Sequence, residues 1–489
     1  MLAVVLAAAM ATAAWLPFLH RPLTPDESGF LLIAQQWRPG HSLYGDYWVD
    51  RPPLLIWLFT LADDLGAVHV TAAGAATAPG LKLIGAVASG TSVALSGVLA
   101  GLVSPGHRSA RITTVLVAAA LLSSPLVGMP GVNGELLALP FVLLGLVCAV
   151  AAMRGSWGWR TAALAAGTGA SGMAAALVKQ NVIDVFVFTL VLVAVSHRQV
   201  PRSWVRTALV AAGATLMLGT VLATAWARGT STPGLWDAVV VFRTHASEMI
   251  DASASSATAV RGALLAAAFF GSGAAVVLGT AAALVLARRT PLAWPAIAMT
   301  GWEVFAIAMG GSYWLHYLTG LVPGLVLLVA IARPGPRARW ALRWAVAYTV
   351  AAALAVWAFH AVIPPQVSPE VQVSSYLREH AHPSDGLVVG FGHPEIVAAS
   401  GLHSPYENLW SLPVRVRDPH LVGLRSITAG ASAPQWIVVD GDSLDTWGLD
   451  AHDAQQYLLR HYVERARYDD WHVWQRRDVP VVEALRIRR

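Results

Sequence analysis

Apolar stretches long enough to cross a bilayer recur along most of this chain and limit what it can fold into. Hydrophobic residues make up 56% of the 489 residues and charged residues only 12%, whereas a soluble domain carries roughly 25% charge. Hydropathy and length predict about eleven transmembrane helices, so the fold class expected is an α-helical polytopic membrane protein. These helices are expected near residues 2–19, 81–103, 112–129, 134–153, 161–178, 182–196, 207–227, 260–287, 291–310, 313–332 and 342–363.

Basic residues predict the orientation of these helices. Every second connection carries arginines, around Arg108, Arg154, Arg202, Arg288 and Arg339. The positive-inside rule places these connections in the cytoplasm. The N-terminus is then cytoplasmic, and the loop 20–80 and everything after Ile363 are extracytoplasmic. We therefore expect a multi-pass protein of a bacterial-type cytoplasmic membrane that contacts membrane lipids.

Two other interpretations of the composition are weaker. Residues 1–19 could be a cleaved signal peptide, but no basic segment precedes the apolar run. The net charge of +5 could suggest nucleic acid as a partner. The basic residues fall in short clusters between apolar stretches and form no continuous face, so no nucleic-acid partner is expected.

The chain changes character at Pro364-Pro365, which divides it into a transmembrane domain, 1–363, and a C-terminal domain, 366–489. In the second part, helix-like segments alternate with short apolar segments typical of buried strands. The helix-like segments are 368–380 and 453–462, and the strand-like ones are 386–392, 435–441 and 469–478. This order predicts a small soluble extracytoplasmic α/β domain.

The loop that follows the first apolar stretch is rich in charged and aromatic side chains. Its sequence, PDESGFLLIAQQWRPGHSLYGDYWVDRPP, spans residues 25–53. Carboxylates are costly near lipid, and those held beside a membrane helix usually bind or catalyse. Two simpler interpretations remain: Thr24 to Glu27 also match a helix start, and residues 44–53 match a structured surface loop. The next segment, 54–65, is too short to span and is predicted to form an amphipathic surface helix.

Three further polar groups fall on the same predicted face. Asn133 and Glu135 match a helix start, Lys179 could reach the headgroup region as a snorkelling side chain, and His316 could be a core histidine. Lys179 is equally suited to binding a phosphate, with Asp184 as a possible partner. Because all of these groups converge on one side of the membrane, we expect a functional site there.

The loop motifs resemble those of a known family. The Asp26-Glu27 pair, the Tyr-Gly-Asp-Tyr run that ends in Arg51-Pro52-Pro53, and the later His316-Tyr317 are similar to motifs of the polytopic C-superfamily glycosyltransferases. The resemblance covers about residues 1–330 and is nearest to the protein O-mannosyltransferase-like and lipid A aminoarabinose transferase-like branch. Two details differ: Ser28-Gly29-Phe30 follows the acid pair where the family has Ala and Tyr, and Arg51 stands where the family has lysine.

This resemblance implies transfer of a sugar from a polyprenyl-phosphate-linked donor, outside the cytoplasmic membrane, to a hydroxyl of a lipid, glycan or protein acceptor. It makes Asp26 the catalytic member of the acid pair and Glu27 its neighbour in acceptor or metal handling, so both are predicted catalytic residues. Such a transfer needs a base for the acceptor proton and cations or hydrogen-bond donors for the departing phosphate. The predicted phosphate-binding residues are Lys179, Arg51, Tyr44, Tyr47 and His316. The residues predicted to handle the acceptor or a metal are Glu135, Asp46 and Asn133.

Alternatives remain open at this point. Asp26, Glu27 and Glu135 could together hold a divalent metal ion, and the sequence does not choose between metal-free and metal-assisted transfer. A transporter or flippase of lipid-linked sugars is a second possibility, although the apolar stretches carry few charges and show no internal repeat. A non-catalytic sensor with a ligand-binding C-terminal domain is a third.

Overall fold

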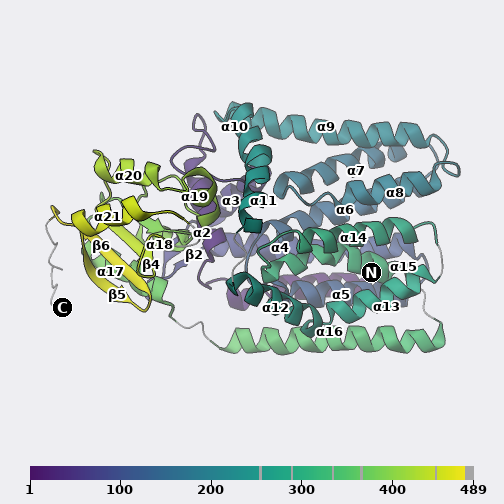
Figure 1. Ribbon diagram of the computed structural model, residues 1–489. Helices are drawn as coiled ribbons and strands as arrows, with labels where there is room; N and C mark the ends of the chain where they lie inside the picture. The colour runs from purple at the N-terminus through teal and green to yellow at the C-terminus, as the bar shows by residue number, and fades with distance from the viewer. Residues whose placement is uncertain (253–255, 288–289, 333–334, 364–366, 446–448, 480–489) are drawn as a thin grey trace.

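The computed structural model describes residues 1–252, 256–287, 290–332, 335–363, 367–445 and 449–479. A bundle of helices forms one part, and a small domain with a β-sheet lies at one end of the bundle (Figure 1). Several predicted features fall outside the described residues: the Pro364-Pro365 boundary, Arg288, and residues 480–489 of the predicted C-terminal domain.

Each predicted apolar stretch is helical. The helices of the bundle are α1 (Leu2–Ala13), α4 (Pro79–Val103), α5 (Arg108–Leu122), α6 (Gly134–Arg154), α7 (Trp159–Val178), α8 (Asp184–Ser196), α9 (Ser203–Ala227), α12 (Ser256–Gly271), α13 (Ala274–Leu286), α14 (Ala293–Ala308), α15 (Val322–Ile331) and α16 (Pro336–Val362). Within the described residues, five helices are long and apolar enough to cross a membrane, or six if the bent pair α12–α13 is one span. The count of eleven spans therefore stays a prediction.

Several of the predicted spans are not single α-helices. The stretch 260–287 is divided into α12 and α13, which meet at an angle of 62°. Gly273 at the break has a φ of +81°, a left-handed conformation that glycine adopts without steric cost. The stretch 313–332 begins as a 3₁₀ helix, Leu315–Leu321, before α15. A 3₁₀ turn also follows α1, at Leu16–Phe18.

The packing of the bundle separates inner from outer helices. All ten residues of α15 are buried, and this helix lies against α4, α5 and α13. By contrast, α9 and α16 run along opposite sides of the bundle in Figure 1. Trp204 near the start of α9 and Trp226 near its end are both exposed, as in the aromatic belts that flank a bilayer.

Shorter elements lie between the bundle and the C-terminal domain (Figure 1). The helix start at Thr24 to Glu27 opens α2 (Pro25–Gln36), and the predicted surface helix 54–65 forms α3 (Pro53–Leu65). A second group comprises α10 (Thr232–Trp236), a π-helical turn (Asp237–Val241) and α11 (Phe242–Ala252). Two short antiparallel strands, β1 (His69–Val70) and β2 (Ala76–Thr77), complete this layer.

The C-terminal domain is a four-stranded sheet with helices around it. Its strand order is β3-β4-β6-β5, with β3 parallel to β4 and the other two pairings antiparallel. Separate apolar clusters pack around the sheet, one including Ile437 and the other including Val438, as expected for alternate residues of a covered strand. The elements are α17 (Pro369–His380), β3 (Leu387–Gly390), α18 (Pro394–Ser400), α19 (Ser411–Arg417), α20 (Val422–Ala429), β4 (Trp436–Asp440), α21 (His452–His461), β5 (Tyr462–Tyr468) and β6 (Trp471–Arg476). The sequence predicted three of these strands and two of these helices, and missed β5 and α18 to α20.

Candidate functional site

Asp26 lies in the first turn of α2, which begins at a capping box. The Thr24 hydroxyl accepts a hydrogen bond from the Glu27 backbone N–H at 3.3 Å, and the Glu27 carboxylate accepts one from the Thr24 backbone N–H at 2.9 Å. Both contacts satisfy donors that a helix start leaves unpaired. The carboxylate of Asp26 is therefore held at the positive end of the helix dipole, where negative charge is favoured. Its side chain is only partly buried.

Glu27 is completely buried, and its carboxylate is already in use. Besides Thr24, its oxygens accept hydrogen bonds from Lys82 Nζ at 2.6 Å and from the backbone N–H of Val132 at 2.8 Å. These contacts join α2 to α4 and to the loop before α6. With three donors on one buried carboxylate, Glu27 has no oxygen directed at a substrate. These contacts indicate a structural role for Glu27, and its catalytic role stays a prediction.

The loop after α2 brings two guanidinium groups to one carboxylate. Arg51 Nη1 lies 2.9 Å from both oxygens of Asp50, and Arg243 of α11 forms a second ion pair with Asp50. Burial alone would lower the pKa of Arg51, but the carboxylates of Asp50 and Asp26 raise it overall. Arg51 therefore stays charged, and the two arginines exceed the single carboxylate by one positive charge.

A second polar group is built by α6, the end of α7 and the 3₁₀ helix. Lys179 forms an ion pair with Glu135, and its Nζ lies 4.9 Å from the centre of the Tyr317 ring. His316 Nε2 lies 4.0 Å from Glu135 Oε2. The charges of Asp26 and Arg51 act on His316 as well. The two groups and Asp26 therefore form one electrostatic cluster.

Lys179 does not pair with Asp184, the partner considered from the sequence. Asp184 begins α8, is buried and lies beside Glu303 of α14. The neighbouring Gln180 instead donates a 2.6 Å hydrogen bond to the Asp50 carbonyl oxygen. This contact holds the end of α7 against the loop that carries Arg51.

Two predicted residues face the C-terminal domain. The Tyr47 hydroxyl accepts a hydrogen bond from the Ser404 backbone N–H at 3.2 Å, and its ring stacks on His403. Asp46 is exposed, with Oδ2 3.9 Å from His403 Nε2. Both side chains therefore contribute to the contact between the loop and the C-terminal domain, and neither joins the cluster around Asp26.

Tyr44 lies on the Asp50 side of the cluster. Its hydroxyl is buried and has no hydrogen-bond partner among the described residues. Burial raises the pKa of Tyr44, and the carboxylates of Asp50 and Asp237 add to the shift. The hydroxyl therefore stays protonated.

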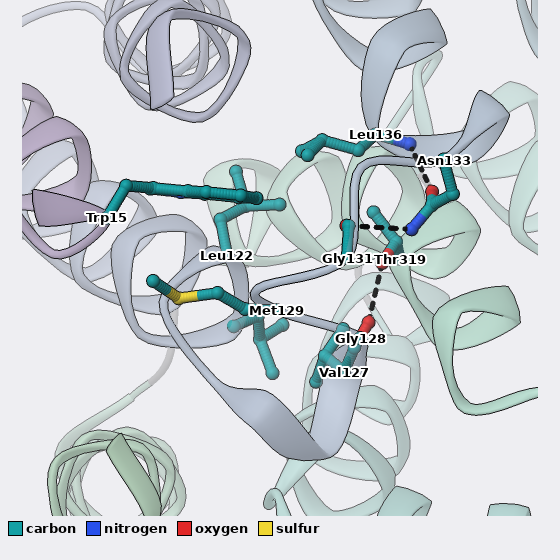
Figure 2. A pocket seen from close by; sticks show the side chains of 10 residues that line it. Trp15, Leu122, Val127, Gly128, Met129, Gly131, Asn133, Leu136 and Thr319 are labelled. Carbon is teal, nitrogen blue, oxygen red and sulfur yellow. Dashed lines mark hydrogen bonds between the residues drawn. The ribbon is translucent and has the colours of Figure 1, made fainter. Parts of the chain in front are cut away.

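Asn133 serves the backbone next to a small cavity. Its Oδ1 accepts a hydrogen bond from the Leu136 backbone N–H at 2.9 Å, and its Nδ2 donates to the Gly131 carbonyl oxygen at 3.2 Å. Figure 2 shows these bonds together with the one from the Thr319 hydroxyl to the Val127 carbonyl oxygen, 2.6 Å long. The cavity beside them measures about 10 Å³, room for a single water molecule. Asn133 therefore fixes the loop before α6.

The acidic residues do not fit a divalent metal site. Such an ion needs several oxygen ligands free to turn toward it. Glu27 is bound to Lys82 and Glu135 to Lys179, which leaves Asp26 alone. Among the described residues, no three His, Cys, Asp or Glu side chains are grouped so as to hold a metal ion.

The structure adds residues to the site that the sequence did not indicate. Trp410 of the C-terminal domain donates a hydrogen bond from its indole N–H to Asp26 Oδ1 at 3.1 Å. Nothing in the local sequence around residue 410 signals this contact, because the partner lies 384 positions earlier in the chain. Lys82 is a second residue that was not singled out from the sequence, although a charge inside an apolar stretch is a usable signal for a buried partner.

Comparison with known proteins gives structural matches only. No model of a known protein family matches the chain, and no curated protein sequence does. The structure of ArnT from Cupriavidus metallidurans in the apo state matches with a TM-score of 0.64 and 14% identity, over 96% of this chain and 97% of that one. The same protein bound to undecaprenyl phosphate gives 0.63 and 13%, with the same coverage. The archaeal oligosaccharyltransferase AglB from Archaeoglobus fulgidus, in complex with an inhibitory peptide and a dolichol-phosphate, gives 0.54 and 12%, over 98% and 74%.

Matches of this coverage at such low identity concern the fold. They extend through both the helix bundle and the C-terminal domain, since nearly the whole chain is aligned. The chain therefore shares the fold of these solved structures, a fold consistent with the one that the resemblance of its loop motifs implies.

Proposed function

We propose that this chain moves a sugar from a polyprenyl-phosphate-linked donor to an acceptor hydroxyl at the extracytoplasmic face of the membrane. Asp26 acts as the general base. Arg51, with Lys179 and Arg243 nearby, binds the donor phosphate. The sugar and the acceptor class are left open by this proposal.

One observation carries it: among the described residues Asp26 has no cation within ion-pairing distance, although Arg51 and Arg243 lie in the same cluster. Three neighbouring acids each have a cation, namely Glu27, Asp50 and Glu135. A carboxylate that is not engaged by a cation is free to accept the proton of an acceptor hydroxyl. The neighbouring arginines supply positive charge where a phosphate would depart.

The chemistry follows from this arrangement. The acceptor oxygen attacks the anomeric carbon of the sugar while the carbon–oxygen bond to the phosphate breaks. The acceptor proton passes to Asp26, and the electron pair of the broken bond stays on the polyprenyl phosphate. Arg51 and Lys179 stabilise the negative charge that grows on that phosphate. The buried Tyr44 hydroxyl is placed to donate a further hydrogen bond from the Asp50 side.

The position of the cluster supports a lipid-linked donor. Glu135 lies at the start of α6 and Arg154 at its end, and a helix of 21 residues is about 30 Å long. This length matches the hydrocarbon core of a bilayer. Arg51 and Lys179 would then lie near the headgroup level, opposite the arginine-bearing end. Solved structures with this fold hold undecaprenyl phosphate or dolichol-phosphate, which supports the same donor class.

A reconstitution assay tests the proposal. The purified protein is placed in liposomes with polyprenyl-phosphate sugars labelled in the sugar, together with membrane extract as the source of acceptors. We expect protein-dependent release of free polyprenyl phosphate and transfer of the label to a new product. Movement of intact donor across the bilayer without cleavage would instead indicate a transporter. Absence of both, across hexose and pentose donors, would overturn the proposal.

A further inference from the structure

One segment of the C-terminal domain, 403–411, lies on the loop that follows α2. The backbone N–H of Trp48 donates to the Glu407 carbonyl oxygen at 2.9 Å, and Trp48 and Asn408 form an isolated parallel β-bridge. The Arg417 guanidinium, just beyond the segment, lies 4.4 Å from the centre of the Trp48 ring. These contacts fix the segment on the loop between α2 and α3.

Trp410 continues this contact directly onto α2. Its ring lies 5.4 Å from that of Phe30. A Cβ atom added at Gly29 would lie 2.7 Å from Trp410 Cη2 and 2.9 Å from Cε2. No side chain larger than hydrogen at position 29 leaves the indole in this place. Trp410 and its neighbour Leu409 also pack on the apolar core of the helix bundle.

The indole N–H meets the one site carboxylate that lacks a cation. It lies 3.1 Å from Asp26 Oδ1, and no hydrogen bond from a described residue reaches Asp26 Oδ2. A neutral donor on one oxygen restricts rotation of the carboxylate, so the second oxygen keeps a fixed direction toward an acceptor hydroxyl. A cation in the same place would hold the carboxylate too, but it would also reduce its basicity.

We propose that Trp410 is the positioning residue of Asp26, so that the C-terminal domain supplies part of the active site. This inference rests on the proposed function, because it assigns Trp410 a task only if Asp26 takes the acceptor proton. The indole holds the base and does not touch the reacting atoms. The C-terminal domain is then required for turnover.

Trp410→Phe tests this inference, since it keeps an aromatic ring and removes the N–H. A hydrogen bond to a charged group is worth about 1.5–3 kcal/mol, or about ten- to a hundredfold in rate. We expect kcat to fall by this factor while the KM for the polyprenyl-phosphate donor stays unchanged, because Arg51 and Lys179 are untouched. A defect of folding would instead lower the amount of active protein. It would not lower kcat per active molecule while leaving KM unchanged.

The chain offers a matched control and an independent variant. Trp436 donates the same kind of bond to Asp385 Oδ2 at 2.9 Å, inside the C-terminal domain, so Trp436→Phe should leave kcat near normal. Gly29→Ala should displace the indole and lower kcat as Trp410→Phe does. When Gly29→Ala and Trp410→Phe are combined, the two decreases in kcat should not add, because Phe lacks the ring atoms that the new methyl group would strike.

Each outcome decides between the two proposals. If the wild-type protein consumes no donor, the proposed function fails and this inference fails with it. If the wild type is active and Trp410→Phe has a normal kcat, only the positioning role of Trp410 is overturned. An equal loss in Trp410→Phe and Trp436→Phe would also overturn it, because both would then act through the stability of the C-terminal domain.

Discussion

Lys82 Nζ lies 2.6 Å from Glu27 Oε1, and both side chains are almost completely buried. The pair joins α4 to the start of α2, next to the residue that we assign as the base. An isolated charge in this environment is strongly unfavourable, and the partner removes most of that cost. The pair therefore supports the position of Asp26 without taking part in the reaction.

We predict that Lys82→Met destabilises the protein by about 3–5 kcal/mol, because Glu27 is left as a buried charge without its cation. Thermal unfolding of the purified protein measures this change. Combining Lys82→Met with Glu27→Gln should recover part of the loss, since the two residues interact directly. A stable Lys82→Met variant with a raised KM for the donor would contradict this and would make Lys82 a phosphate ligand.

Asp26→Asn should reduce sugar transfer by about 10²–10⁴-fold, the usual contribution of a general base. The amide has nearly the same shape as the carboxylate and still accepts the indole hydrogen bond, so the fold should be kept. The measurement is the rate of polyprenyl phosphate release. Asp64→Asn, an exposed acid at the end of α3, is the control and should be fully active. Near-normal activity of Asp26→Asn would leave Asp26 with a role in the helix start alone.

Arg51→Met should raise the KM for the donor about ten- to a hundredfold, because one charge-assisted hydrogen bond to the phosphate is lost. Substrate-dependence curves with the labelled donor give this value. Arg38→Met removes an exposed arginine from the same loop and should change the KM little. Equal KM values for the two variants would exclude Arg51 from the phosphate site.

Lys179→Met should also weaken donor binding, but Lys179 is paired with Glu135, so the variant leaves an uncompensated carboxylate. Lys179→Met with Glu135→Gln separates the two effects. If Lys179 binds the phosphate, the loss of about ten- to a hundredfold persists in the double variant. Recovery of normal kinetics in the double variant would mean that Lys179 only neutralises Glu135.

The predicted orientation can be checked by labelling single cysteines in intact cells after Cys148 is replaced. Ser28, which directly follows the acid pair, is completely buried, so a cysteine at this position would not report on the orientation. Ser231 and Ser109 are both exposed. We expect an impermeant thiol reagent to label Ser231→Cys and to leave Ser109→Cys unreacted. The reverse pattern would place the candidate site in the cytoplasm and remove the donor assignment.

Local sequence was sufficient where the determining interactions are local. The start of α2 follows from Thr24, Pro25 and Glu27, because the capping box involves residues three positions apart. The strand predicted at 435–441 forms β4 (Trp436–Asp440), because a short apolar run bounded by a glycine fits a strand covered on both faces. The same reasoning could not foresee the bend at Gly273, which depends on how α12 and α13 pack against neighbouring helices.

By itself, the sequence determined that the chain is helical and apolar and that a charged loop, whose motifs resemble those of a glycosyltransferase family, follows its first helix. The sequence did not determine which of the two acids, Asp26 or Glu27, lacks a cation partner among the described residues. Asp26 and Glu27 are adjacent and chemically alike, but a helix turns about 100° per residue, so the two carboxylates point to different surroundings. Glu27 meets Lys82 and Val132, whereas Asp26 meets Trp410 from a domain that begins more than 300 residues later. Only the tertiary structure brings these partners together, and the partners decide which carboxylate remains available as a base.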